Sequence, residues 1–218
     1  QNAILYSLRE NESPLARNYV DNLLKERKKY SIFVASISVV NRNFHVVSSS
    51  EEYEPGTVSA MKDVDPKYQT GEFIIGDVYE RITDDGRKNV VPAYTGVYYN
   101  NELIGYVMEE LDTAYFDDLR LNMDTLADGT FYLLDGNGAI ITAGDTKNKR
   151  SLKTFVSKSS DRNDFQKKWD AIDHEKNPSG YVRYRYHRQD YITYYSDVEN
   201  TCWGIRVTEN LSAQKQTG

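Results

Sequence analysis

The sequence predicts an α+β fold made of two similar modules, each an antiparallel sheet with flanking helices. Apolar runs separated by turns rich in Gly, Asn and Asp predict strands joined by short connections, which pair antiparallel. Apolar stripes with a spacing near 3.6 lie between these runs and predict helices. A weak repeat supports duplication, because residues 39–48 (VVNRNFHVVS) align with residues 133–142 (LLDGNGAIIT). A repeat at domain-sized spacing indicates two modules rather than a solenoid.

The first module is expected to open with a helix. Apolar residues recur at helical spacing through 15–24, after the cap Ser13 and before the basic run 25–29. A hairpin within 31–49 follows, and the polar segment 51–70 is expected to hold one short helix around 58–62. Three further strands are expected at 73–83, 90–99 and 103–111.

The second module repeats this order of elements. An apolar stripe within 111–126 predicts a connecting helix, and FYLLDGNGAIIT at 131–142 predicts a tight hairpin. A helix carrying Phe165, Trp169 and Ile172 is expected to end at Asn177-Pro178. Three more strands are expected at 180–187, 191–196 and 203–208. The expected domain boundaries are 1–120 and 121–218.

Composition excludes several classes of protein. The 218 residues carry a net charge of −6, which argues against general nucleic-acid binding, since such binding depends on Lys and Arg contacts to phosphates. The single cysteine, Cys202, excludes an internal disulfide and a cysteine-based zinc site. No apolar run reaches the roughly 18 residues of a membrane span, and no signal-peptide pattern occurs. Because the chain begins at Gln1 without Met, we expect it to be part of a longer protein.

Several stretches resemble one family of bacterial receptors. These are LLDGNGAIITAGD at 133–145, the segment 74–78 together with Gly105-Tyr106-Val107 and Glu110, and the ending at 194–205, where a turn leads into a strand that starts at Trp203. They resemble the double Cache domains, which are extracytoplasmic, PAS-like ligand sensors of transmembrane receptors. The resemblance covers nearly the whole chain and implies two tandem modules of five-stranded sheet preceded by a helix.

The resemblance also implies a function. It predicts a non-enzymatic sensor that binds a small molecule in the membrane-distal module, 1–120, and signals across the membrane through the proximal module, 121–218. The parent chain would be membrane-anchored, with a diguanylate cyclase (GGDEF), histidine kinase or chemotaxis module as its output. No cofactor is implied, and homodimerisation is left open. The alternative is a protein–protein interaction module without a small ligand, in which Tyr-rich sheets bind a partner.

In this family the ligand lies between the later strands of the first module and the loop before them. The family's amino-acid-binding cluster, Arg-x-Trp-Tyr, is replaced here by Asp65-Pro66-Lys67-Tyr68, so the resemblance carries over no α-amino-acid ligand. Strand alternation places Asp77, Tyr79 and Arg81 on one face, and Tyr94 and Tyr98 on one face of the next strand. Arg81 would pair with a ligand carboxylate, Asp77 or Glu110 with an amine, and the tyrosines would pack against its body. The candidate site residues are Tyr68, Asp77, Tyr79, Arg81, Tyr94, Tyr98 and Glu110.

Other chemical readings are weaker. Residues 135–138 (DGNG) fit a structural turn better than a calcium loop, because Ala139 stands where a third ligand is needed. The same glycines do not complete a dinucleotide fingerprint. The run 181–188 (YVRYRYHR) interleaves Tyr and Arg, but alternation predicts a half-buried strand rather than a nucleic-acid platform. No catalytic constellation appears, so no enzymatic activity is expected.

Overall fold

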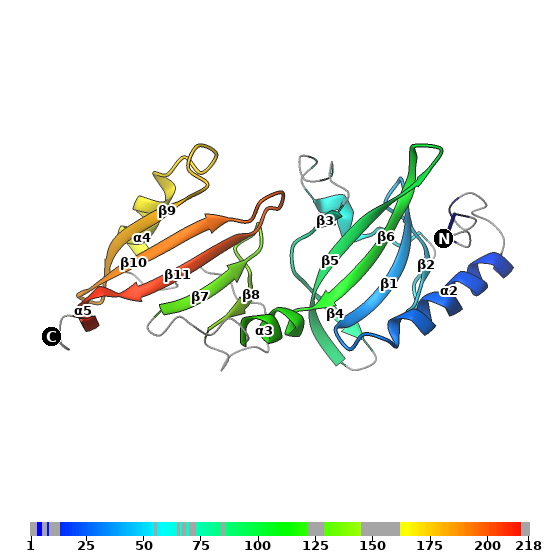
Figure 1. Ribbon diagram of the computed structural model, residues 1–218, viewed down its shortest axis with the longest axis horizontal. Coiled ribbons are helices and arrows are strands. Elements are labelled where there is room, and N and C mark those ends of the chain that lie inside the picture. The colour runs from blue at the N-terminus through cyan, green and yellow to red at the C-terminus, as the bar shows by residue number, and fades with distance from the viewer. Residues whose placement is uncertain are drawn as a thin grey trace. The chain divides into compact units, whose positions relative to one another are not determined.

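The computed structural model describes residues 4, 5, 8, 14–54, 56–64, 66, 69, 73–83, 86–121, 129–144 and 162–214. The chain forms two compact units, Gln1–Tyr115 and Phe116–Gly218. Each unit is built on one antiparallel sheet, so the predicted α+β class is confirmed (Figure 1). The helix α3 (Ala114–Leu121) carries the chain from the first unit into the second.

The first unit contains a six-stranded sheet with the order β2-β1-β6-β5-β3, in which β4 pairs with β5 outside this path. A helix, α2, and a short 3₁₀ helix, η1, accompany the strands (Figure 1). The elements are α2 (Pro14–Lys28), β1 (Val34–Asn41), β2 (Val46–Ser49), η1 (Ala60–Asp63), β3 (Phe73–Ile75), β4 (Tyr79–Thr83), β5 (Gly86–Tyr99) and β6 (Glu102–Asp112).

The sixth strand arises because the single strand expected at 73–83 is divided in two. β3 and β4 both pair with β5, and the break between them lies opposite Pro92. Proline has no N–H to donate, so it cannot continue a regular ladder. Gly76 instead donates its N–H to the Pro92 carbonyl at 2.9 Å, and a Cβ on Gly76 would lie 2.8 Å from the Pro92 ring. The chain therefore passes close to Pro92 before β4 resumes pairing.

The two faces of this sheet are packed differently. Alternation along β1 sends Ile37 and Val39 to one face, where they meet Val20 and Leu24 of α2. The other face carries a second apolar cluster, which η1 covers with Met61. This cluster consists of Val40, Val46, Met61, Val64, Ile74, Tyr94, Tyr106 and Met108.

The second unit contains a five-stranded sheet with the order β8-β7-β11-β10-β9. Its elements are β7 (Gly129–Leu134), β8 (Ile140–Ala143), α4 (Arg162–Asp170), β9 (Ser179–Tyr186), β10 (Gln189–Asp197), β11 (Gly204–Asn210) and α5 (Leu211–Gln214). Along β9, Val182 is buried while Arg183 and Arg185 are exposed, so the predicted half-buried strand is confirmed.

The internal repeat has the same backbone geometry in both units. Asn41 Oδ1 accepts the N–H groups of Asn43 and His45 at 2.9 and 3.1 Å. Asp135 Oδ1 accepts those of Asn137 and Ala139 at 3.0 and 2.7 Å. Such a side chain holds its own turn closed, and the Asp135 carboxylate is thereby committed to backbone donors. This geometry confirms the structural turn that was preferred to a calcium loop.

Two predicted helices differ from those found. The short helix expected around 58–62 is the 3₁₀ helix η1, which Ser59 caps by accepting the Met61 N–H. The helix that carries Phe165 and Trp169 ends at Asp170 rather than at Asn177. The described part of the connecting stripe is α3, and residues 122–128 lie outside the described chain. None of the described helices combines the length and apolar character needed to span a membrane.

Candidate ligand-binding site

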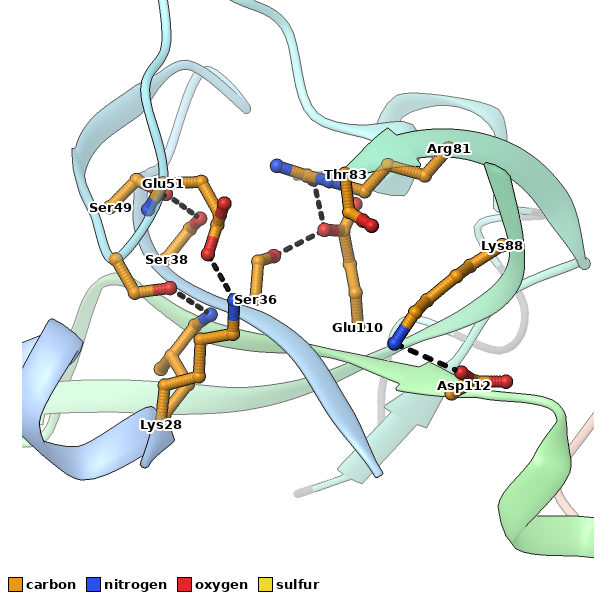
Figure 2. A network of polar contacts seen from close by, with 12 residues as sticks. Lys28, Ser36, Ser38, Ser49, Glu51, Arg81, Thr83, Lys88, Glu110 and Asp112 are labelled. Carbon is orange, nitrogen blue, oxygen red and sulfur yellow. Dashed lines mark hydrogen bonds and ion pairs between the residues drawn. The ribbon is translucent and has the colours of Figure 1, made fainter. Parts of the chain in front are cut away.

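The candidate site is centred on the carboxyl group of Glu110, on the face of the first sheet that carries the η1 cluster. Pairing of β1 with β6 places Ser36 directly opposite Glu110, and Ser36 Oγ donates a hydrogen bond to Oε2. Two side chains of β4 reach the same group. Tyr79 donates its hydroxyl to Oε1. Arg81 donates Nη1 to Oε2 (Figure 2).

Glu110 is buried, with 1% of its side chain exposed, while Arg81 is 23% exposed. Burial raises the pKa of Glu110 to about 7, the Ser36 hydrogen bond and Lys28 act in the opposite direction, and Glu51 adds to the rise. Burial also lowers the pKa of the Arg81 guanidinium, against the charge of Glu51. The Arg81 ion pair favours the ionised carboxylate, because a nearby cation stabilises a buried negative charge. The protonation state of Glu110 therefore depends on the positions of the charged side chains around it.

A second set of polar contacts joins this face to α2. Ser38 and Ser49 exchange a hydrogen bond between their hydroxyls at 2.9 Å, and Ser49 donates its N–H to Asp21 Oδ1 at 2.8 Å. Lys28 in the last turn of α2 forms an ion pair with Glu51, which follows β2 (Figure 2). Side chains of α2 are therefore bonded to the end of β2 and to the segment that follows it.

A cavity of about 980 Å³ adjoins this network. It lies among the end of α2, the start of β1, the segment after β2, and the β4–β5 hairpin. Arg81 contributes to its wall and so contacts both the cavity and Glu110. The charged side chains that line it are Lys25, Glu26, Lys28, Lys29, Glu51, Glu52, Arg81 and Lys88. These charged side chains can form charge-assisted hydrogen bonds with a small, charged ligand.

The structure brings three of the predicted site residues together, namely Tyr79, Arg81 and Glu110. Tyr94 is fully buried in the η1 cluster, where burial raises the pKa of its hydroxyl. Tyr98 is 55% exposed and lies against Gly96 near the β5–β6 turn. These two tyrosines make no hydrogen bond with Glu110.

The remaining two candidates lie elsewhere. Asp77 is half-buried in the link between β3 and β4, before β4 begins. Tyr68 lies outside the described residues.

Sequence reasoning missed the serines and the α2 contacts. Ser36 and Ser38 are buried at alternate positions of a strand that is otherwise apolar on both faces. Two serines at alternate positions of an apolar strand indicate a polar group on the same face, because a hydroxyl buried in a sheet core needs a hydrogen-bond partner. Lys28 was interpreted only as part of the charge at the end of a helix. Its ion pair with Glu51 depends on packing between elements, which helical periodicity does not specify.

Within the described parts of the chain, no group of three or more His, Cys, Asp or Glu side chains is placed to hold a metal ion. The site is instead made of one buried acid, one cation, hydroxyl groups and an adjoining polar cavity. Such an arrangement can exchange its internal hydrogen bonds and ion pair for those of a charged ligand.

Comparison with known proteins gives a match of fold. No protein-family model and no curated protein matches this sequence. Several solved structures match at 12–16% sequence identity. Among them, the ligand-binding domain of Mlp24 with asparagine has a TM-score of 0.59 at 14% identity, and the match covers 100% of this chain and 83% of that one. The sensor domain of the V. cholerae histidine kinase DctB matches with a TM-score of 0.57 at 13% identity, covering 95% and 84%.

A chemoreceptor gives a similar result. The ligand-binding domain of Campylobacter jejuni Tlp3, solved with 4-methylisoleucine, has a TM-score of 0.56 at 15% identity and covers 94% of this chain and 76% of that one. Both sheets of this chain therefore have counterparts in these structures. The chain has the fold of the extracellular sensor domains of histidine kinases and chemoreceptors, the double Cache arrangement that its sequence resembles.

Proposed function

We propose that this chain is the extracytoplasmic ligand-sensing region of a bacterial membrane receptor, and that a small charged molecule binds beside Glu110. The first module, 1–120, would be membrane-distal and would hold the ligand, and 121–218 would be membrane-proximal. The likeness in fold to sensor domains of histidine kinases and chemoreceptors supports this assignment. The output would be a cytoplasmic signalling module of one of these receptor classes. The domain itself carries no catalytic role in this proposal.

The observation that carries the proposal is the Arg81–Glu110 ion pair at the wall of the cavity. A buried ion pair contributes little net stability, because desolvation of both charges offsets their attraction. A ligand carboxylate can replace Glu110 as the partner of Arg81, and a ligand amine can replace Arg81 as the partner of Glu110. In the first exchange Glu110 loses its cation, and because burial raises its pKa to about 7 it can take up a proton instead of remaining a buried unpaired charge. In the second exchange Arg81, which is 23% exposed at the cavity wall, can turn toward solvent.

The same contacts offer a route for the signal. Glu51 lines the cavity and is held by Lys28, while Asp21 holds Ser49. A ligand that binds Arg81 or Glu51 would change the ion pair between Glu51 and Lys28 at the last turn of α2. In this proposal α2 has two positions, and the chain binds the ligand more tightly with α2 in one of them. A ligand shifts a conformational equilibrium only through such a difference in affinity. The helix would then move relative to the membrane span that precedes it in the parent receptor.

The test is a thermal-shift screen of the purified chain against amino acids, amines, organic acids, purines and sugars, followed by calorimetry of any hit. We expect Arg81→Met to weaken binding roughly 10- to 100-fold, since a lost charged hydrogen bond is worth about 1.5–3 kcal/mol. Arg87→Met is the matched control, because Arg87 is 72% exposed on β5 and pairs with Glu80 on the surface.

Equal affinity of the Arg81→Met and wild-type chains, with both folded by circular dichroism, would overturn the site assignment. A screen in which no class of compound raises the melting temperature would favour the alternative function, a module that binds another protein. Tyr98 and Tyr99 at the β5–β6 turn, which are 55% and 38% exposed, are the first residues to mutate in that case.

A further inference from the structure

The second unit contains a buried arginine that forms no ion pair at contact distance, although the charge of Asp197 acts on it from farther away. Arg206 on β11 is 8% exposed and makes no ion pair with any residue of the described chain. Its guanidinium lies over the Trp169 ring at 4.4 Å and near the Tyr195 ring at 5.6 Å. Its one hydrogen bond runs from Nη1 to the Ile205 carbonyl at 2.8 Å. The other donors of this guanidinium have no acceptor in the described chain and are not among its buried unpartnered atoms, so they reach solvent, where a ligand can approach them.

The sheet is shaped to hold this group flat. Tyr195 on β10 is paired with Arg206 across the ladder, and Gly180 on β9 is paired with Tyr195. A Cβ at Gly204 would lie 2.6 Å from Arg206 Nη1, and a Cβ at Gly180 would lie 2.8 Å from the Tyr195 hydroxyl. The two glycines thus leave space for the guanidinium and the phenol ring on one face.

A second polar atom of the same cluster also lacks a partner. The ring of His174 lies 4.5 Å from Trp169 and 5.4 Å from Tyr195, measured between centroids. Its Nε2 atom is buried and makes no hydrogen bond within the described chain. The cluster of Trp169, His174, Tyr195 and Arg206 therefore contains unused donors of Arg206 and an unused ring nitrogen of His174.

Burial lowers the pKa of Arg206, and the charge of Asp197, which forms no ion pair with it, offsets only part of this desolvation cost. Its contacts with Trp169 and Tyr195 offset part of this cost. An anion that accepts two parallel hydrogen bonds would offset the rest, and a planar carboxylate fits the guanidinium fork. We propose that the second unit binds a small-molecule carboxylate through Arg206, at a site separate from the one beside Glu110.

The two tryptophans of the chain make this site directly observable. Trp169 and Trp203 both belong to the second unit, and Trp169 contacts Arg206. In a Trp203→Phe chain, the fluorescence of Trp169 reports on the cluster alone. We would titrate this chain with sodium acetate, sodium succinate and sodium phosphate, each against sodium chloride of equal ionic strength. We expect a saturable change in emission with a carboxylate and none with chloride.

Variants separate binding from structure. We expect Arg206→Met to weaken the carboxylate response at least tenfold while the melting temperature without ligand stays close to that of the parent, since no ion pair is lost. Arg183→Met is the matched control, because Arg183 is exposed on β9 and contacts only the Tyr181 ring at 5.7 Å among aromatic side chains of the described chain. That control and Arg81→Met should both keep the full response.

Three results would overturn the proposal. One is a flat titration with both carboxylates, and another is an equal response in Arg206→Met. The third is a saturable response to phosphate alone, which would assign the site to a different class of anion. Loss of the response in Arg81→Met would mean that the signal comes from the first unit. Because the readout is confined to Trp169, it stays interpretable even if the site beside Glu110 binds nothing.

Discussion

Glu110 occupies an environment that does not commit it to one protonation state. Its carboxyl is removed from water, which favours the neutral acid, yet it accepts hydrogen bonds from Ser36, Tyr79 and Arg81, which favour the anion. Burial raises the pKa to about 7, Glu51 adds to the rise, and the Ser36 hydrogen bond and Lys28 oppose it. Arg81, as an adjacent cation, favours the ionised form, so its displacement would favour the neutral acid.

The pH dependence of stability should reveal this group. A carboxyl whose pKa is raised on folding stabilises the folded state below its unfolded pKa, and this contribution is lost as pH rises through the folded pKa. Between pH 4.5 and 7 the wild type should therefore lose stability relative to Glu110→Gln. The difference between 7 and the ordinary 4.5 corresponds to at most about 3 to 4 kcal/mol, at about 1.4 kcal/mol per pH unit.

Urea unfolding of both chains at pH 5 and pH 8 measures this effect. Glutamine keeps an acceptor for Arg81 and Tyr79 but does not titrate, so the variant removes the pH response with little change in shape. Parallel pH profiles for the two chains would show that the carboxyl has an ordinary pKa.

The candidate site was predictable only in part from sequence. Alternation correctly assigned Tyr79 and Arg81 to one face, and the family resemblance supplied Glu110. Alternation fixes the face of a strand but not the position along it, which is set by pairing with another strand. Tyr98 thus lies opposite Leu103, far along β6 from Glu110, and β5 and β6 shift register between Val97 and Tyr98.

Among the elements, the hairpins were the most predictable, because their turns are specified by a few adjacent residues. Asn41 and Asp135 each hold a turn through a side-chain oxygen, and the fourth position of each turn has a positive φ. That position is Phe44 in the first unit, at φ 65°, and Gly138 in the second, at φ 75°. Glycine adopts this conformation without strain, whereas a side chain does not.

Gly138→Ala should therefore destabilise the second unit by about 1 kcal/mol through backbone strain alone. A Cβ at this position would meet nothing within 4 Å, so no steric clash adds to the cost. Gly144→Ala is the control, since its Cβ would make only an ordinary contact of 3.5 Å with the Phe131 N atom. Thermal unfolding followed by Trp fluorescence compares the two, and an equal loss in both would exclude the φ of Gly138 as the cause.

The break between β3 and β4 could not have been predicted from local sequence. Residues 73–83 show a pattern suited to one strand, and the interruption depends on Pro92, which lies on the neighbouring strand. The early end of α4 has a local cause instead: Asp173 accepts the N–H groups of Lys176 and Asn177, which forms a separate turn where a longer helix is expected.

At the scale of the whole molecule, the chain divides into two compact units, each with its own sheet, and we expect these units to unfold in separate transitions. Val39 is fully buried under α2 in the first unit, and Val39→Ala should cost about 2 kcal/mol. Because both tryptophans lie in the second unit, Trp fluorescence should keep its midpoint in this variant. Far-UV circular dichroism detects both sheets. It should show that the transition of the first unit moves to a lower urea concentration.

Val182→Ala is the matched variant in the second unit, where Val182 is 3% exposed on β9. It should lower the urea midpoint followed by Trp fluorescence and leave the transition of the first unit unchanged. A single transition that moves equally by both probes in both variants would show that the units unfold cooperatively.

The position of β4 has a consequence for how such a receptor could diversify. Tyr79 and Arg81 belong to a strand that pairs only with β5 and lies outside the main path of the sheet. Mutations there alter the partners of Glu110 while leaving the apolar clusters and the α2 contacts in place. Substitutions in this strand would therefore change the ligand preference of the proposed site one residue at a time, so a duplicated copy of the domain would diverge in specificity without first losing its fold.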